Sequence, residues 1–155
     1  MKSLQTQTSR ISVSVNGTKS YYTKKDFSSL DQNKCIDKLA YGTMVKKITK
    51  KGNGSLRSVL FYINEDDPSQ LQWLSTMKEY WRSRIDLLKV KTITERPMSK
   101  LTKKAQAHAN NLLCIYYGAD EELLLVFDNP NDKLEWWCGL QYFIVRAHEK
   151  LKMAA

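Results

Sequence analysis

The chain has 155 residues, 42% of them hydrophobic, and a formal net charge of +9 at pH 7. That length supports one well-filled core and is too short for two ordinary domains. No window approaches the roughly 18 to 20 apolar residues that a membrane span needs, and Met1 leads into no signal-peptide core. The positive surplus lies upstream of about Lys100, which favours an anionic partner such as lipid headgroups or nucleic acid.

The sequence contains no motif in which residues suited to catalysis or metal binding occur at the required spacing. His108 and His148 are isolated, and no phosphate-cradling GxxxxGK run is present. The three cysteines, Cys35, Cys114 and Cys138, are widely spaced and form no CxxC motif, which predicts reduced thiols in a cytosolic protein. We therefore predict no enzyme activity, no cofactor and no metal site.

The first part of the chain is predicted as a polar tail followed by a short helix. Residues 1–26 are rich in Ser, Thr, Gln and Lys, and their one alternating run, residues 11–15, leaves an added edge strand as the alternative. Lys2 stands where N-myristoylation needs glycine, so no acyl signal is predicted. Apolar residues at helical intervals predict a leading helix over residues 27–39: Phe27, Leu30, Ile36 and Leu39. A single domain is predicted over residues 27–152.

The middle of the chain is predicted as a meander of four antiparallel strands. Alternating residues from Gly42 to Ile63 form a hairpin with a basic, glycine-rich tip, and a turn at residues 65–69 leads to a third strand. A loop then leads to a fourth strand over residues 85–93. This loop holds three basic residues: Lys78, Arg82 and Arg84.

The last third is predicted to hold a polar excursion, a hairpin and one helix. Residues 99–110 read as a long loop or a short helix, and two strands meet at a turn over residues 118–121. The helix is predicted from about residue 131 to 150, with Asn129 as N-cap and Pro130 at the first helical position. One apolar stripe on it is predicted to fill the core: Trp136, Gly139, Leu140 and Phe143.

A second apolar stripe lies beside the first on the same predicted helix. It contains Trp137, Leu134 and Ile144, followed by Val145. A helix of a single domain should be polar on that side. Either the N-terminal segment around Phe27 packs over this stripe, or the stripe is an exposed surface for a protein partner.

Six short segments carry a resemblance to a known family. They are residues 42–46, 60–63, 71–73, 85–88, 114–118 and 136–140. In order and spacing they resemble pleckstrin homology (PH) domains, most closely those at the N-terminus of phosphoinositide-specific phospholipases C. They are also similar to the small stand-alone PH-like proteins of apicomplexan parasites, the acylated PH and inner-membrane-complex sub-compartment proteins. The likeness covers about residues 36–150.

The resemblance implies a mainly β fold with α: a seven-stranded, bent antiparallel barrel or sandwich capped by a C-terminal helix. It also implies a non-catalytic module that is recruited by anionic phospholipid, phosphatidic acid or phosphoinositide, to the cytosolic face of a membrane. The alternative is a PH-fold scaffold that binds protein and has lost specific lipid binding. Nucleic acid is not predicted as a partner, because no known basic-aromatic motif appears.

The family's headgroup pattern is a lysine late in the first strand and two basic residues at i and i+2 early in the second. Lys46 or Lys47 fills the first position and Arg57 one of the others, while Ser55 and Val59 beside it are uncharged. The resemblance therefore implies weak, charge-driven lipid contact. The candidate lipid-binding residues are Lys46, Lys47, Lys50, Lys51, Arg57, Lys78, Arg82 and Arg84.

Overall fold

The computed structural model describes residues 9–15, 18–24, 27–48, 55–75, 78–97 and 100–154. The strands are β1 (Ser9–Val15), β2 (Thr18–Lys24), β3 (Thr43–Ile48), β4 (Leu56–Ile63), β5 (Gln70–Ser75), β6 (Lys78–Asp86), β7 (Val90–Thr94), β8 (Leu112–Tyr117) and β9 (Glu121–Val126). The helices are α1 (Gln32–Ala40), α2 (Lys103–Gln106) and α3 (Pro130–Ala154), with 3-10 turns η1 (Leu87–Lys89) and η2 (Ala109–Asn111).

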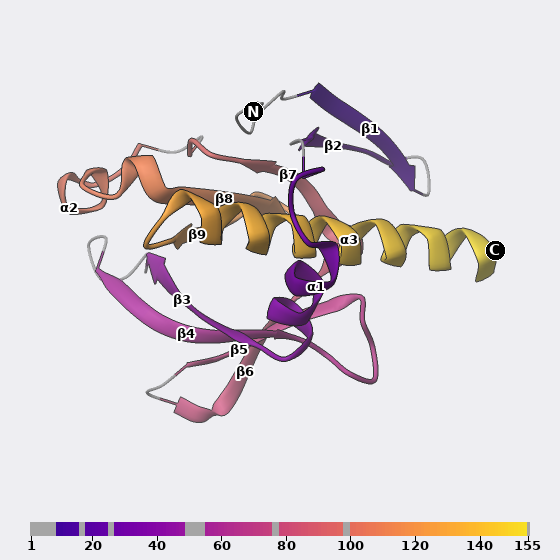
Figure 1. Ribbon diagram of the computed structural model, residues 1–155, viewed down its shortest axis with the longest axis horizontal. Helices are drawn as coiled ribbons and strands as arrows, with labels where there is room; N and C mark the ends of the chain where they lie inside the picture. Colours follow the sequence, from indigo (N-terminus) through magenta and orange to yellow (C-terminus); the bar gives the residue numbers. More distant parts are fainter. Residues whose placement is uncertain are drawn as a thin grey trace.

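Seven strands form one antiparallel sheet in the order β6-β5-β4-β3-β9-β8-β7. The two edge strands, β6 and β7, do not pair with each other over the residues described, so the sheet stays open. Among the residues described, the half β6-β5-β4-β3 joins the half β9-β8-β7 only where Lys46 pairs with Val126 and Lys47 with Leu125. Figure 1 shows α3 running along the opening between the halves. The predicted mainly β fold with a capping C-terminal helix is confirmed.

The helix α3 begins as the sequence predicts. The side-chain oxygen of Asn129 accepts a hydrogen bond from the backbone N–H of Asp132 at 2.8 Å, and Pro130 is the first helical residue. Trp136 is fully buried, with its ring centroid 5.9 Å from that of Phe61 and 5.8 Å from that of Phe127. The predicted core position of Trp136 is confirmed. Its two aromatic neighbours belong to different halves of the fold, because Phe61 lies in β4 and Phe127 directly follows β9.

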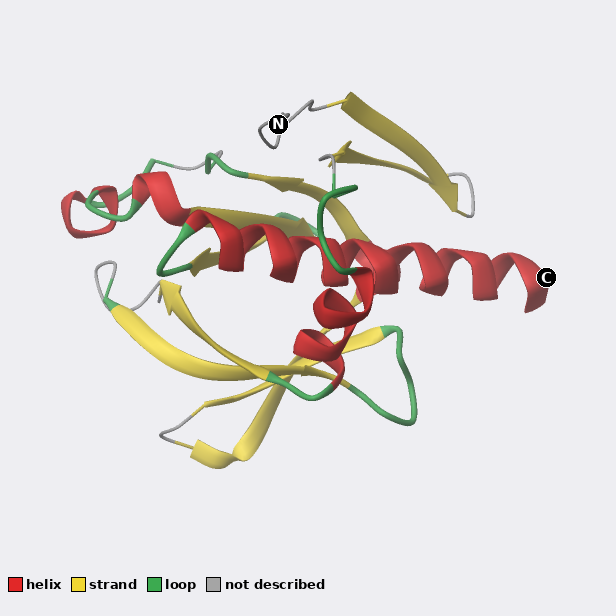
Figure 2. Ribbon diagram, in the orientation of Figure 1, coloured by secondary structure: helices red, strands yellow, loops and turns green. Residues whose placement is uncertain are grey.

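Trp137 of the second apolar stripe of α3 lies against the chain's own N-terminal segment. Leu134, Trp137 and Ile144 are 7%, 0% and 0% exposed, and the ring of Phe27 lies 6.1 Å from that of Trp137. The helix α1 packs against α3 (Figure 2). Of the two predicted alternatives, packing is the one observed. The partner surface proposed at these three residues is corrected, because their side chains are not accessible.

The leading helix starts later than the predicted residue 27. The Asp31 side chain accepts hydrogen bonds from the backbone N–H groups of Asn33 and Lys34, so the helix begins at Gln32. Phe27 therefore reaches Trp137 from an irregular segment ahead of the helix.

The region predicted as a loop and a fourth strand is divided differently. Lys78–Asp86 is a strand, β6, and the chain turns through η1 before β7 begins at Val90. The turn forms because the Asp86 side chain accepts a hydrogen bond from the backbone N–H of Leu88 at 3.0 Å. Apolar residues on both sides of the turn give the sequence the pattern of one continuous strand.

The segment predicted as a polar tail contains the hairpin of β1 and β2. β2 lies beside β7, at one edge of the main sheet (Figure 1). Thr and Tyr residues, which favour strands, dominate β2 and explain the hairpin. The domain boundary at residue 27 stays a prediction.

The polar segment after β7 contributes to a second, smaller core, and of the loop and the short helix left open for it, a short helix, α2, is observed. Ala105 of α2 is buried against the face of the sheet that points away from the main core. The cluster contains Ile48, Ala105, Leu112, Cys114, Leu124 and Val126. The excursion thus covers the outer face of β8 and β9.

Candidate anionic-ligand site

Lys47 and Arg57 face each other across the β3–β4 hairpin. The register pairs Lys47 with Arg57, two positions after the pair of Val45 with Val59. Both valines are buried in the core, and side chains alternate along a strand, so Lys47 and Arg57 lie on the core-facing side of the sheet. They occupy the hairpin end, where this face meets solvent. Two cations are therefore held side by side on a stiff support.

Trp73 of β5 supports this pair of cations. The Lys47 Nζ lies 5.3 Å from the centroid of the Trp73 ring, a cation–π distance. Trp73 is 6% exposed and packs at 5.3 Å on the ring of Phe61, its partner in the register. The indole thus fixes the ammonium group in place. Arg57 is exposed, and no ion pair engages it within the part of the chain that the structure describes.

Trp73 falls in the predicted third strand, and nothing in the sequence marks it as part of a binding site. The strand register is the signal that could have identified it. Trp73 on β5 pairs with Phe61 on β4, and β4 pairs with β3, so only one strand separates Trp73 from β3. Pairing across three strands brings a tryptophan and a lysine together although they are far apart in sequence.

Lys46 and Arg84 belong to the opposite face of the sheet. Lys46 pairs with Ser58, and its Nζ lies 3.5 Å from Asp128 Oδ1 in an ion pair between two exposed groups. Arg84 is exposed and pairs with Gln72. The cluster predicted from sequence is therefore divided between two faces, and among its members with described side chains only Lys47 and Arg57 share the core-facing side.

The other predicted lipid-binding residues are not tested. Lys50 and Lys51 fall in the hairpin tip, outside the described residues. Lys78 and Arg82 lie in β6, where the register pairs them with Ser75 and Leu74 and the side chains are not described. Their roles stay predictions.

A cavity of about 250 Å³ lies where β3 diverges from β9. Its lining includes two cations, Lys38 and Lys46, and two anions, Asp128 and Asp132. Each lysine already contacts an acid of the lining, at 3.5 Å in both cases. This cavity is therefore electrically balanced and does not suit an anionic ligand.

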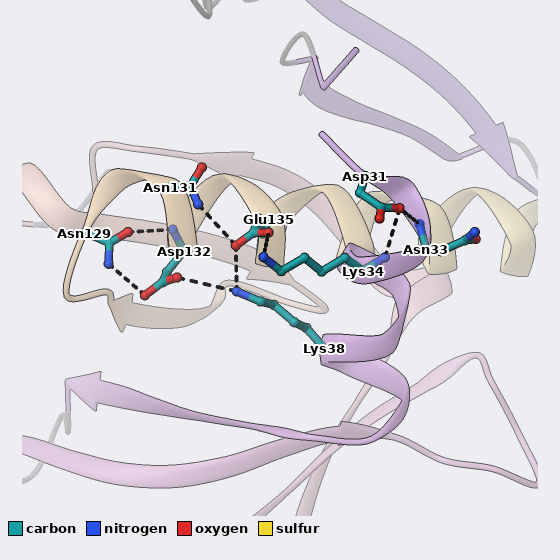
Figure 3. A network of polar contacts seen from close by, with 8 residues as sticks. All are labelled: Asp31, Asn33, Lys34, Lys38, Asn129, Asn131, Asp132 and Glu135. Carbon is teal, nitrogen blue, oxygen red and sulfur yellow. Dashed lines mark hydrogen bonds and ion pairs between the residues drawn. The ribbon is translucent and has the colours of Figure 1, made fainter. Parts of the chain in front are cut away.

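Beside the cavity, a polar network ties α1 to α3 (Figure 3). The Lys38 Nζ donates to Glu135 Oε1 at 2.8 Å, and Lys34 forms an ion pair with the other carboxylate oxygen at 3.3 Å. The hydrogen bond from Lys38 and the charges of both lysines hold the pKa of Glu135 below its ordinary value, although burial opposes this. Burial acts to lower the pKa of Lys38, but the bond to Glu135 and the nearby carboxylates raise it on balance. The network is a structural clamp.

No group of His, Cys, Asp and Glu suited to a metal ion occurs among the residues described. None of the described helices combines the length and apolar character needed to cross a bilayer. The 25 residues of α3 carry charged side chains along their length.

No protein-family model matches the chain, and no curated protein matches it by sequence. Solved structures do match. Inner membrane complex sub-compartment protein 1 from Toxoplasma gondii aligns with a TM-score of 0.59 at 15% identity, over 79% of this chain and 98% of that one. The C-terminal PH domain of human pleckstrin aligns with a TM-score of 0.51 at 16% identity, over 68% of this chain and 87% of that domain. The chain therefore has a pleckstrin-homology-like fold, as the resemblance implied.

Proposed function

We propose that this protein is a recruitment module that binds anionic phospholipid at the cytosolic face of a membrane. The observation that carries the proposal is the pairing of Lys47 with Arg57 on the core-facing side of the β3–β4 hairpin, with the Lys47 ammonium held over Trp73. Phosphorylated headgroups concentrate negative charge, and a binder needs cations that converge on a rigid support. The proposal is supported by the resemblance to PH domains, in which lipid contact is expected at this same hairpin end.

The binding proposed here is weak and driven by charge. Ser55 and Val59 flank Arg57 at the positions where a third cation would complete the family's pattern. Two cations on one face, with the tip lysines nearby in sequence, attract a negative surface without enclosing one headgroup. Each basic residue near an anionic membrane contributes on the order of 1 kcal/mol. Phosphatidic acid and phosphoinositides are the proposed lipids.

The chain offers a matched pair of double variants as a test. Lys47→Gln with Arg57→Gln removes two charges from the core-facing side, and Lys46→Gln with Arg84→Gln removes the same two residue types from the outer face. Both variants have the same composition and net charge. Sedimentation with phosphatidylcholine vesicles containing phosphatidic acid should show a loss of binding for the first variant and near-normal binding for the second. Equal losses would mean that only the overall charge matters and would overturn the proposed site.

The alternative function is that of a protein-interaction scaffold. A groove of about 550 Å³ at the far end of α3 favours it, because Leu88, Leu151 and Met153 line this groove and Met153 is 87% exposed. Vesicle binding distinguishes the two functions. A scaffold would not sediment with anionic vesicles at any salt concentration.

A further inference from the structure

Two of the three cysteines meet at the interface between α1 and α3. Cys35 and Cys138 are both buried, and the thiol of Cys138 helps to raise the pKa of Cys35, so the two thiols lie close together. The backbones also touch there, since a Cβ added to Gly139 would lie 2.3 Å from the carbonyl oxygen of Cys35. The absence of a side chain at Gly139 lets the two helices approach closely enough for the thiols to meet. The third cysteine, Cys114, belongs to the separate core beneath α2.

We propose that Cys35 and Cys138 form an oxidation site, at which a peroxide converts the two thiols into a disulfide that fastens α1 to α3. Sequence spacing hides this pair, because 103 positions separate the two residues (138 − 35). A disulfide needs Cα atoms roughly 4.4 to 6.8 Å apart, and the backbone contact between Cys35 and Gly139, the neighbour of Cys138, provides a close approach of this kind. This site is separate from the proposed lipid site, because the two cysteines lie on α1 and α3 whereas Lys47 and Arg57 lie on β3 and β4.

The reaction balances with one peroxide molecule. One thiol loses its proton, its sulfur attacks an oxygen of hydrogen peroxide, and the O–O bond breaks. The hydroxide that leaves takes up the proton, which gives a sulfenic acid and one water. The second sulfur then attacks the sulfenic sulfur, forms the S–S bond, and releases the oxygen as a second water. The two thiols lose two electrons in total, and the peroxide gains them.

Burial makes the oxidation depend on the movement of α1. Cys35 is 0% exposed and Cys138 is 7% exposed, and burial is the main cause that raises the pKa of both thiols. Because the thiolate is the reactive form, the packed thiols are protected. α1 has only 9 residues, too few for a helix that is stable alone, so its docking rests on packing and on the clamp at Glu135. Transient opening of α1 exposes the thiols, and re-docking brings them together.

The test treats the full chain with hydrogen peroxide and maps its peptides without reduction. The expected product is one intramolecular link between Cys35 and Cys138, with Cys114 still a free thiol. The melting temperature should rise on the order of 10 °C, because the link closes a long loop, and dithiothreitol should reverse the rise. Cys138→Ser should abolish both effects. A link that includes Cys114, a link between two chains, or two thiols that stay free after the treatment would overturn the proposal.

A second measurement examines the opening step. Glu135→Gln weakens the bonds to Lys34 and Lys38, so the disulfide should form several-fold faster and at the same two residues. Glu95→Gln is the matched control, since Glu95 pairs at 3.0 Å with Lys133 of α3 and takes no part in the clamp on α1. Equal rates in the two variants would rule out opening of α1 as the step that admits the peroxide.

Discussion

The carbonyl oxygen of Cys35 lies against Gly139, where an added Cβ would come within 2.3 Å of it. The contact joins the backbones of α1 and α3, so neither side can yield by a change of rotamer. α1 in turn holds Phe27 over Trp137. This backbone contact and the contact of Phe27 with Trp137 both join the N-terminal segment to α3.

Gly139→Ala should destabilise the protein although alanine favours helices. Alanine in place of glycine gains up to about 1 kcal/mol in a helix, whereas forcing extra volume into a packed contact costs about 1 to 3 kcal/mol. We expect a net loss of roughly 1 to 2 kcal/mol in urea unfolding followed by tryptophan fluorescence. Val145→Ala, on the same helix and 44% exposed, serves as the control and should change little. Equal stability of the Gly139→Ala variant and the wild type would contradict the close approach.

Trp136→Ala should destabilise the fold by roughly 3 to 5 kcal/mol, because it empties a fully buried site between Phe61 and Phe127. Tyr41→Ala removes another aromatic ring at a position 86% exposed and should change the free energy of unfolding by less than about 0.5 kcal/mol. Thermal unfolding measures both. An unchanged melting temperature for the Trp136 variant would remove this residue from the core.

Glu135→Gln should destabilise the protein at neutral pH and have less effect in acid. The pKa of Glu135 is lowered in the folded state, so its contribution is present above the ordinary pKa of a glutamate and is lost as the pH falls through the folded-state value. At pH 7 the loss should be about 1 to 2 kcal/mol, since a charge-assisted hydrogen bond to a nearly buried carboxylate is weakened. Denaturant unfolding of both proteins from pH 7 to pH 3 tests this. A difference that stays constant with pH would assign the effect to packing.

The sequence predicts the elements of this fold that are fixed by local chemistry. The cap at Asn129 followed by Pro130 predicts the start of α3, and the turn at Gly118 predicts the β8–β9 hairpin. It does not predict the break between β6 and β7. There the side-chain oxygen of Asp86 decides where the strand stops, within a run of apolar residues.

The division of the candidate site between two faces has a similar cause. Met44 and Val45 are both apolar, so the hydrophobic pattern of β3 does not determine which of them faces the core. A shift of one residue moves every side chain of a strand to the other face. The structure buries Val45 and leaves Met44 56% exposed, which assigns Lys47 to the core-facing side and Lys46 to the other. Only the pairing with β4 resolves this choice.

Lipid binding by this protein should fall steeply with salt and should not depend strongly on which anionic headgroup is offered. Arg57 is exposed and Lys47 is half-buried beside it, and mobile ions screen charges near the surface over about 10 Å at 0.1 M salt. Stable recruitment therefore requires a second attachment, which adds effective concentration without any new lipid contact. Affinities for vesicles of phosphatidic acid, phosphatidylserine and several phosphoinositides, measured at low and at physiological salt, test this expectation. Submicromolar binding to a single phosphoinositide that survives physiological salt would contradict it. A stereospecific pocket would then need a third cation, and the tip lysines Lys50 and Lys51 would be the first to substitute.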